Sequence, residues 1–152
     1  MITIYTDGSS RGNPGPGGYG TVMKYKEHRK EMSEGYRKTT NNRMELLAVI
    51  IGLEALKVQQ ANVMIYSDSK YVVDAVEKGW LDNWIKKDFK GKKNKDLWLR
   101  FHDIYQKHRV KFNWVKGHAG IPENERCDQP AVEAAKGSNL KVDEGFESGL
   151  YS

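Results

Sequence analysis

The sequence has very little cysteine and no long apolar run, and both absences narrow the class of protein. Cys127 is the only cysteine among 152 residues, so an internal disulfide is excluded and nothing indicates an oxidising compartment. No apolar stretch approaches the roughly 18 residues that a membrane-spanning helix needs, and the first residues, MITIYTDG, do not resemble a signal peptide. We therefore expect a cytoplasmic protein with no membrane contact.

The composition fits one globular domain, and the charge favours a polyanionic partner. A chain of this length can enclose a core, and the net charge is +5 with a pI of about 9.2. Lysines are concentrated in one short stretch: Lys86, Lys87, Lys90, Lys92, Lys93 and Lys95. Aromatic residues at Trp80, Trp84, Phe89 and Trp98 surround them, a combination that suits phosphates and bases, although a solvated lysine-rich loop is the structural alternative.

The periodicity of apolar residues predicts alternating strands and helices. Runs rich in β-branched and aromatic residues predict strands over residues 2–7, 19–26, 31–38, 62–68 and 110–117. Helical spacing predicts helices from TTNN to about Lys57, over 69–79, over 80–87, around Leu97–Tyr105, and from 122 or 123 to 135. The polar, Gly/Ser-rich tail over 137–152 is expected to be loosely ordered, which leaves 1–136 as the single domain.

This order of elements predicts an α/β fold and the place of its site. Strands separated by helices imply a five-stranded mixed sheet, with an antiparallel meander and parallel strands, flanked by helices. Asp7 is expected to end the first strand and Asp68 the fourth. Because sites in open α/β sheets lie at the carboxyl ends of parallel strands, both carboxylates should emerge at the same rim.

Four acids are the candidate metal ligands, although each has a structural alternative. Asp7 could begin a turn, Asp68 could cap a helix, Glu45 could interact with a helix dipole, and Asp128 could be an exposed helical acid. Glu45, however, adjoins the apolar stripe of its helix and should project along the helix–sheet boundary. Converging carboxylates repel one another without a cation, and an all-oxygen set suits Mg²⁺ or Mn²⁺ better than zinc.

Five segments together carry a resemblance to a known family. They are YTDGSSRGNPGPGGYG, TTNNRMELLAVIIGLEAL, YSDSKYV, DLW and WVKGHAGIPENERCD. In this order, and over nearly the whole chain, they resemble bacterial ribonuclease H of type 1. The resemblance implies the ribonuclease H-like fold and an endonuclease that hydrolyses the RNA strand of RNA–DNA hybrids, leaving 5′-phosphate and 3′-hydroxyl ends. Removal of RNA primers and hybrids during replication would be its role.

The resemblance also assigns the catalytic positions. Asp7, Glu45, Asp68 and Asp128 match the family's metal-binding acids, which hold two Mg²⁺ ions, or Mn²⁺ as a substitute, when substrate is bound. His118 matches its auxiliary histidine, and the near-neutral pKa of a histidine suits proton movement. A surface-loop histidine is the alternative.

Recognition of a hybrid is expected to involve a polar set and a DNA-side set. Positions that contact the minor groove, where the 2′-hydroxyl lies, are Asn13, Asn41, Asn42 and Lys70. Positions for the DNA strand are a phosphate pocket of Lys38, Thr40 and Asn94, an aromatic channel of Trp80 and Trp98, and a basic protrusion with Lys86, Lys87, Lys90, Lys92 and Lys93. Asn41 or Asn42 could instead cap a helix, and Trp98 also sits at core-like spacing.

Several residues depart from the family's pattern. Lys38 stands for an arginine, Lys70 for a frequent glutamine and Phe89 for a tryptophan. Pro130 stands where leucine is usual, within the helix that carries Asp128, and a proline in a helix interior costs on the order of 3 kcal/mol. The helix would kink, or restart with Pro130 in its first turn. We predict lower stability, and a displaced Asp128 with weaker metal binding, relative to Pro130→Leu.

Other functions remain open at this point. Displacement of Asp128 would leave a weakly active or non-catalytic module that binds hybrids. A transposase-like or junction-resolving DNA nuclease would share the clustered acids but gives no reason for the GNPG and TTNN motifs. A domain detached from a reverse transcriptase is the third alternative. The initiator methionine favours a free-standing enzyme instead. We expect this enzyme to be a monomer that binds RNA–DNA hybrids.

Overall fold

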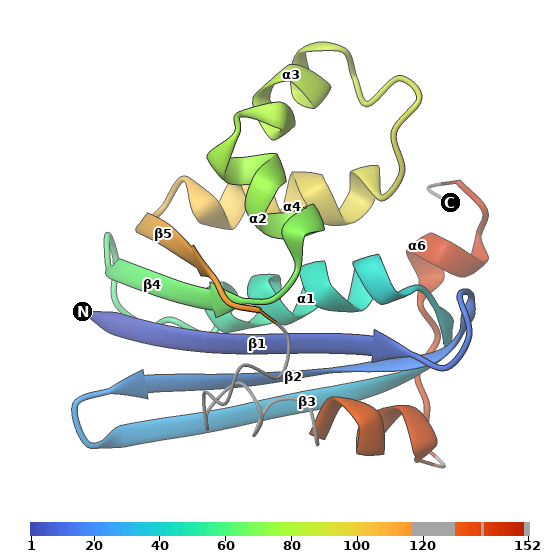
Figure 1. Cartoon of the computed structure of the whole chain (residues 1–152), viewed down its shortest axis with the longest axis horizontal. Coiled ribbons are helices and arrows are strands. Elements are labelled where there is room, and N and C mark those ends of the chain that lie inside the picture. The colour runs from blue at the N-terminus through green and yellow to red at the C-terminus, as the bar shows by residue number, and fades with distance from the viewer. Residues whose placement is uncertain (117–129, 138, 151–152) are drawn as a thin grey trace.

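The computed structural model describes residues 1–116, 130–137 and 139–150. It contains a five-stranded sheet in the order β3-β2-β1-β4-β5 (Figure 1). The strands are β1 (Ile2–Ser10), β2 (Gly15–Tyr25), β3 (His28–Thr39), β4 (Asn62–Ser67) and β5 (Arg109–Trp114). The labelled helices are α1 (Asn41–Glu54), α2 (Lys70–Glu77), α3 (Trp80–Lys86), α4 (Lys95–Tyr105) and α6 (Glu144–Glu147), and residues 130–136 are also helical. The predicted mixed sheet is therefore confirmed.

Strand β1 pairs over different lengths on its two sides. Its parallel pairing with β4 covers Ile2 to Tyr5, whereas its antiparallel pairing with β2 continues to Ser10. Asp7 therefore does not end the strand, as the sequence predicted, because hydrogen bonds to β2 keep the following glycine-containing segment extended. It lies two residues beyond the last parallel pair, Tyr5 with Tyr66, where the sheet opens between β1 and β4.

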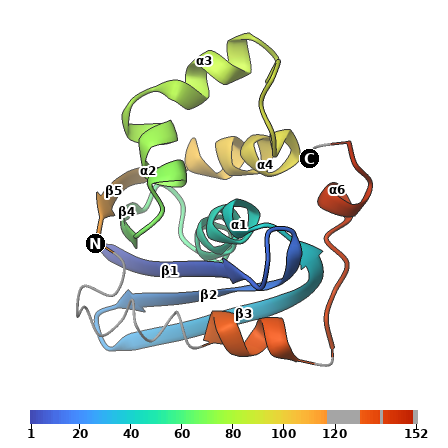
Figure 2. The same ribbon diagram turned by 45° about the vertical axis from the view of Figure 1, so that its right-hand side comes forward.

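The helices cover both faces of the sheet. Figures 1 and 2 show α1 across one face of the sheet with α4 beyond it, and the helical segment 130–136 against β2 and β3. An added Cβ at Gly17 would meet Met44 of α1, whereas one at Gly18 would meet Ala131, so the two helices lie on opposite faces. Because α1 is enclosed between the sheet and α4, all residues from 43 to 50 are buried, a wider set than the stripe seen in the sequence.

Trp98 belongs to the core. Its side chain has no exposed surface, and its ring contacts those of Tyr71, Trp84 and Phe101. The indole N–H is satisfied internally by donating to the Tyr71 hydroxyl at 2.8 Å. The expectation that Trp98 lines a channel for DNA is therefore wrong, and its helical spacing reflected packing in the core.

The C-terminal segment 139–150 is ordered against the domain, which contradicts the expected loose tail. Lys141 forms a bridge with Tyr36 of β3, with backbone hydrogen bonds of 2.9 Å from Lys141 N to Gly35 O and from Arg37 N to Lys141 O. Asp143 is 7% exposed and α6 follows it. Composition suggested mobility because the segment is polar, but Lys141, Asp143 and Glu147 form hydrogen bonds or ion pairs with residues of the domain.

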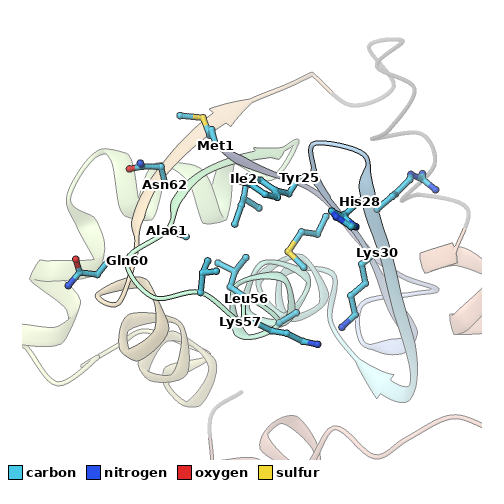
Figure 3. Close-up of a pocket in the computed structure, with 14 residues that line it drawn as sticks. Met1, Ile2, Tyr25, His28, Lys30, Leu56, Lys57, Gln60, Ala61 and Asn62 are labelled. Carbon is cyan, nitrogen blue, oxygen red and sulfur yellow. The ribbon is translucent and has the colours of Figure 1, made fainter.

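One large cavity lies at the end of the sheet away from the candidate metal ligands Asp7 and Asp68. It has a volume of about 660 Å³ and lies around Met1, Leu56 and Ala61, with His28 and Lys57 among its basic lining residues (Figure 3). Met1 and Ile2 line it, so it is at the opposite end of β1 from Ser10. Within the described ranges, no helix has the length and apolar character that crossing a membrane requires.

Candidate active site

Three acidic side chains from separate parts of the chain meet where β1 and β4 diverge. Asp7 comes from β1, Glu45 from the first half of α1, and Asp68 from the residue directly after β4. Each offers a carboxylate oxygen, and these oxygens all lie within 4.8 Å of one another. The sequence predicted that these acids meet at the rim of the sheet. The structure brings the three together although they are separated by up to 61 positions in the chain (68 − 7).

A glycine permits the close approach of α1 to β1. A side chain at Gly8 would overlap the α1 backbone at Met44 and Glu45, so only glycine fits here without displacing the helix. The Gly8 N–H donates to Asp7 Oδ1 at 2.9 Å and also to Glu45 Oε1. The TDG sequence therefore supplies both a metal-ligand candidate and the donor that orients two of the carboxylates.

The electrostatics of Glu45 favour a bound cation. Its side chain is only 4% exposed, and burial, followed by the negative charges of Asp7 and Asp68, raises the pKa of Glu45 well above its usual range. A divalent cation would offset both causes, because it replaces lost hydration and attracts all three carboxylates. The all-oxygen donor set fits Mg²⁺ or Mn²⁺, so the residues present suit the expected class of metal.

The three carboxylates line an open polar cavity of about 380 Å³ with several residues predicted to contact RNA. Asn41, Asn42, Lys70 and Tyr71 are among the other lining residues. Thr40, and not either asparagine, is the N-cap of α1, because its side chain accepts from Arg43 N at 3.3 Å. Asn41 and Asn42 are exposed.

Asn13 and Lys70, both of the predicted minor-groove set, have partners close to this cavity. Asn13 Oδ1 accepts from the backbone N–H of Asn41 at 3.1 Å, which ties the glycine-rich loop to the start of α1. The Lys70 ammonium lies 4.7 Å from the centre of the Trp114 ring, and the Trp114 indole donates to the backbone oxygen of Asp68. The four polar residues therefore surround one region.

The predicted DNA-side residues are placed in different environments. Lys38 is exposed near the end of β3, and Trp80 is 44% exposed with the Lys78 ammonium 5.4 Å from its ring centre. Asn94 is 6% exposed and has a left-handed conformation at the start of α4. Its side-chain oxygen accepts from Arg43, and its amide nitrogen donates to the Tyr71 hydroxyl at 3.0 Å.

The basic segment from the end of α3 to the start of α4 extends away from the sheet (Figures 1 and 2). All five of its predicted phosphate-binding lysines are exposed: Lys86, Lys87, Lys90, Lys92 and Lys93. Phe89 is buried beneath them with 4% exposure, and the Lys92 ammonium lies 5.4 Å from the centre of the Trp84 ring. Aromatic side chains thus anchor a loop whose charges face solvent.

Two predicted catalytic residues, His118 and Asp128, lie outside the described residues. Pro130 is the first described residue of the helical segment 130–136, so its place within a helix agrees with the expectation. The effect of Pro130 on Asp128 stays a prediction.

Arg43 was not recognised from the sequence as a key residue. It is 1% exposed, and its guanidinium bonds to Asp96, Asp143 and Asn94. Its only signal was a charged residue four positions before Leu47, on the apolar side of the helix. Its acidic partners are distant in sequence and could not be identified by spacing.

Comparison with known proteins agrees with this geometry. The family model described as RNase H matches residues 1–136. A ribonuclease H of Desulforamulus reducens is 61% identical over 147 residues, which cover 93% of this chain and 92% of the relative. A ribonuclease H of Rippkaea orientalis is 52% identical over 152 residues, covering 97% and 93%. The chain belongs to the ribonuclease H family.

Solved structures of the family have the same fold. The crystal structure of LC9-RNase H1, described as a type 1 RNase H with the type 2 active-site motif, superposes with a TM-score of 0.79 at 32% identity and covers 97% of this chain and 79% of the other. LC11-RNase H1 in complex with an RNA/DNA hybrid has a TM-score of 0.69 at 26% identity, with 90% and 97% covered. The resemblance seen in the sequence motifs is therefore confirmed, and so is the expectation of a hydrolytic nuclease.

Proposed function

We propose that this chain cuts the RNA strand of RNA–DNA hybrids internally and leaves 5′-phosphate and 3′-hydroxyl ends. In the cell this activity would remove RNA primers and other hybrids during replication. The observation that carries the proposal is the convergence of Asp7, Glu45 and Asp68, with a buried Glu45 whose pKa is raised by burial and by its two acidic neighbours. Family membership supports the reaction class.

The carboxylates would hold two Mg²⁺ ions, or Mn²⁺, when substrate is bound, with Asp128 as the fourth ligand. Bound divalent cations supply Lewis acidity at the scissile phosphate and a more acidic water. The chain's own contribution is orientation: Gly8 N–H fixes carboxylate oxygens of Asp7 and Glu45, and β4 delivers Asp68 beside them. His118 is proposed to assist proton movement.

The polar rim of the cavity is proposed to recognise the RNA strand. Asn41, Asn42 and Lys70 line the cavity of the carboxylates, and Asn13 bonds to the backbone of Asn41. Amide groups can both donate to and accept from a 2′-hydroxyl. Because α1 is capped by Thr40, the side chains of Asn41 and Asn42 are not needed for that role. Discrimination against all-DNA duplexes would come from these contacts.

The opposite side of the substrate is proposed to meet Lys38, Thr40, Asn94 and Trp80. The exposed lysines Lys86, Lys87, Lys90, Lys92 and Lys93 would add phosphate contacts beyond them. Such contacts release counterions, so hybrid affinity should fall steeply as salt concentration rises. The hybrid complex of LC11-RNase H1 shows that a protein of this fold and family binds this type of duplex.

Substitution of Asp7 by asparagine tests the proposed function. Asn keeps the shape of the side chain but removes a negative charge from the cluster, so we expect hybrid cleavage to fall about a hundredfold or more. The assay would use a labelled RNA–DNA hybrid with Mg²⁺, beside an all-DNA duplex and a double-stranded RNA. The variant should keep the wild-type fold, as measured by circular dichroism, and should still bind the hybrid.

Asp103→Asn is the matched control, because Asp103 is an exposed acid of α4 outside the cavity. It should cleave at the wild-type rate. Equal cleavage by Asp7→Asn and Asp103→Asn would contradict the catalytic assignment of Asp7. Wild-type protein that binds the hybrid but releases no 5′-phosphate RNA fragments would contradict the proposed reaction.

A further inference from the structure

The Arg43 guanidinium connects three parts of the chain that are far apart in sequence. Its five N–H groups have five acceptors: Nε donates to Asp143 at 2.8 Å, Nη2 donates to Asp143 at 2.9 Å and to Asp96 at 2.7 Å, and Nη1 donates to Asp96 at 2.9 Å and to Asn94 at 3.2 Å. Burial alone would lower the pKa of Arg43, but the bonds to Asp96 and Asp143 raise it. The guanidinium is therefore charged and fully engaged.

On one side of Arg43 lies the C-terminal segment. Asp143 Oδ2 accepts from the Thr39 hydroxyl at 2.6 Å as well as from Arg43, and Asp143 Oδ1 accepts from Phe146 N at the start of α6. Asp143 thus joins the end of β3, the beginning of α1 and the segment 139–150. Figure 1 shows α6 beside the beginning of α1.

On the other side of Arg43 lies the proposed hybrid site. Arg43 fixes the side-chain oxygen of Asn94, and this determines the direction in which the two N–H groups of the Asn94 amide point. One of them donates to the Tyr71 hydroxyl at 3.0 Å, and Tyr71 lines the cavity of Asp7, Glu45 and Asp68. A continuous series of hydrogen bonds therefore runs from Asp143 to a residue of the active-site cavity.

Gly145 shows how closely the segment is fitted to this network. A Cβ at Gly145 would overlap the Asp96 carboxylate and contact Arg43 Nη2. A substitution at this position would therefore force α6 and the Arg43–Asp96 pair apart while leaving every charged group of the network in the chain.

We propose that the segment 139–150 is a positioning element of the hybrid site, in which Asp143 acts through Arg43 to orient the amide of Asn94 toward the DNA strand. This inference rests on the proposed function, because Asn94 is assigned to DNA-strand binding there. Without Asp143, Arg43 loses two of its five acceptors and can swing toward Asp96, which leaves the Asn94 amide held mainly by its hydrogen bond to the Tyr71 hydroxyl. The donor that should face a phosphate would be oriented for only part of the time.

A double-mutant cycle tests the inference. Asn94→Ala removes the proposed DNA contact, Asp143→Ala removes its support, and the third protein carries both changes. We expect each single variant to raise the KM for the hybrid by about 3- to 10-fold with kcat within about twofold of wild type. The double variant should have the KM of Asn94→Ala, because Asp143 acts through a group that is already absent.

Two further variants separate positioning from loss of stability. Leu53→Ala removes a fully buried side chain of α1 remote from Asp143 and should lower Tm without changing the KM. Gly145→Ala should raise the KM as Asp143→Ala does, and it serves as the second variant if Asp143→Ala fails to fold. All assays are made at a temperature at which each variant is folded.

The outcomes distinguish the inference from the proposed function. If wild type cleaves the hybrid and Asn94→Ala raises the KM, the proposed function stands. An unchanged KM in Asp143→Ala and Gly145→Ala, or effects of Asn94 and Asp143 that multiply in the double variant, then overturns the inference alone. An unchanged KM in Asn94→Ala overturns the DNA contact and the inference with it.

Discussion

Arg43 and Glu45 lie two residues apart at the beginning of α1, both buried, and they have opposite electrostatic surroundings. Arg43 is 1% exposed, and its positive charge is paired with the negative charges of Asp96 and Asp143. Glu45 is 4% exposed, and the neighbours that shift its pKa, Asp7 and Asp68, carry the same charge as itself. One helix turn therefore contributes to two clusters of charge that the fold treats differently.

The difference separates a cluster that stabilises the fold from a cluster that we propose to be functional. Around Arg43, burial of charge is balanced within the chain, since every guanidinium N–H has an acceptor. Around Glu45, burial and like charge both oppose ionisation, so the folded protein carries a cost that the proposed divalent cation would remove. Sites that bind cations commonly contain such unfavourable pairs of groups.

The largest effect on stability is expected from Arg43→Met. This change leaves Asp96 and Asp143 without their buried cationic partner and should destabilise the fold by about 3–5 kcal/mol, or roughly 10 °C in Tm. Arg100→Met is the matched control, because Arg100 is 44% exposed in its ion pair with Glu54 and should cost far less. Similar thermal denaturation of both variants would show that the Arg43 cluster is not structural.

A smaller change, this time a gain in thermal stability, is expected from Glu45→Gln in the absence of metal. The pKa of Glu45 is higher in the folded state than in the unfolded state. Protonated Glu45 therefore contributes its full stabilisation at a pH below the unfolded-state pKa, and this contribution is lost as pH rises through the folded-state pKa. The amide that replaces the carboxyl group in Glu45→Gln stays neutral at every pH. The Tm of this variant at pH 8 should therefore exceed that of wild type by a few degrees, with little gain at pH 4.

Added Mg²⁺ should reverse that ranking, raising the Tm of wild type but not of Glu45→Gln. Glu54→Gln, on the exposed side of the same helix, should keep the wild-type response to Mg²⁺. Differential scanning calorimetry with and without Mg²⁺ measures both effects. A metal-free Glu45→Gln protein that melts below wild type at pH 8 would contradict this account of Glu45.

The smallest effect is expected from Glu147→Gln. Glu147 pairs with Arg37 at 2.8 Å, and this hydrogen bond lowers the pKa of Glu147, yet the pair lies at the surface. Screening by solvent should limit the change in Tm to less than about 2 °C. Thermal denaturation at low and high salt checks this. A loss as large as that of Arg43→Met would show that the segment is held mainly by its exposed pair and not by Asp143.

The elements of the sheet and most of the site were predictable because their signals are local. Alternating apolar residues identified the strands, and TDG and SDS placed Asp7 and Asp68 at the rim where β1 and β4 diverge. The extension of β1 to Ser10 was missed, because it depends on pairing with β2 and not on the residues of β1 itself. Glu45 was identified because it adjoins an apolar stripe.

The residues that were misassigned have ambiguous local patterns. Trp98 fits both a nucleic-acid channel and a core, and only its neighbours Tyr71, Trp84 and Phe101 decide for the core. The segment 139–150 has a composition that suggests mobility, yet Asp143 finds Arg43 a hundred residues away in the chain (143 − 43 = 100). The sequence around Asp143 gives no sign that Arg43 is its partner, and the sequence around Arg43 gives no sign of Asp143.

The sequence by itself determined the mixed α/β sheet, the family and the identity of the acids that meet at its rim, since periodicity and short motifs depend on neighbours along the chain. Only the tertiary structure decided which charges are balanced, which aromatic rings are buried, and where the C-terminal segment docks. The physical reason is that burial and ion pairing depend on distances in space, and those distances are set by the packing of the whole domain.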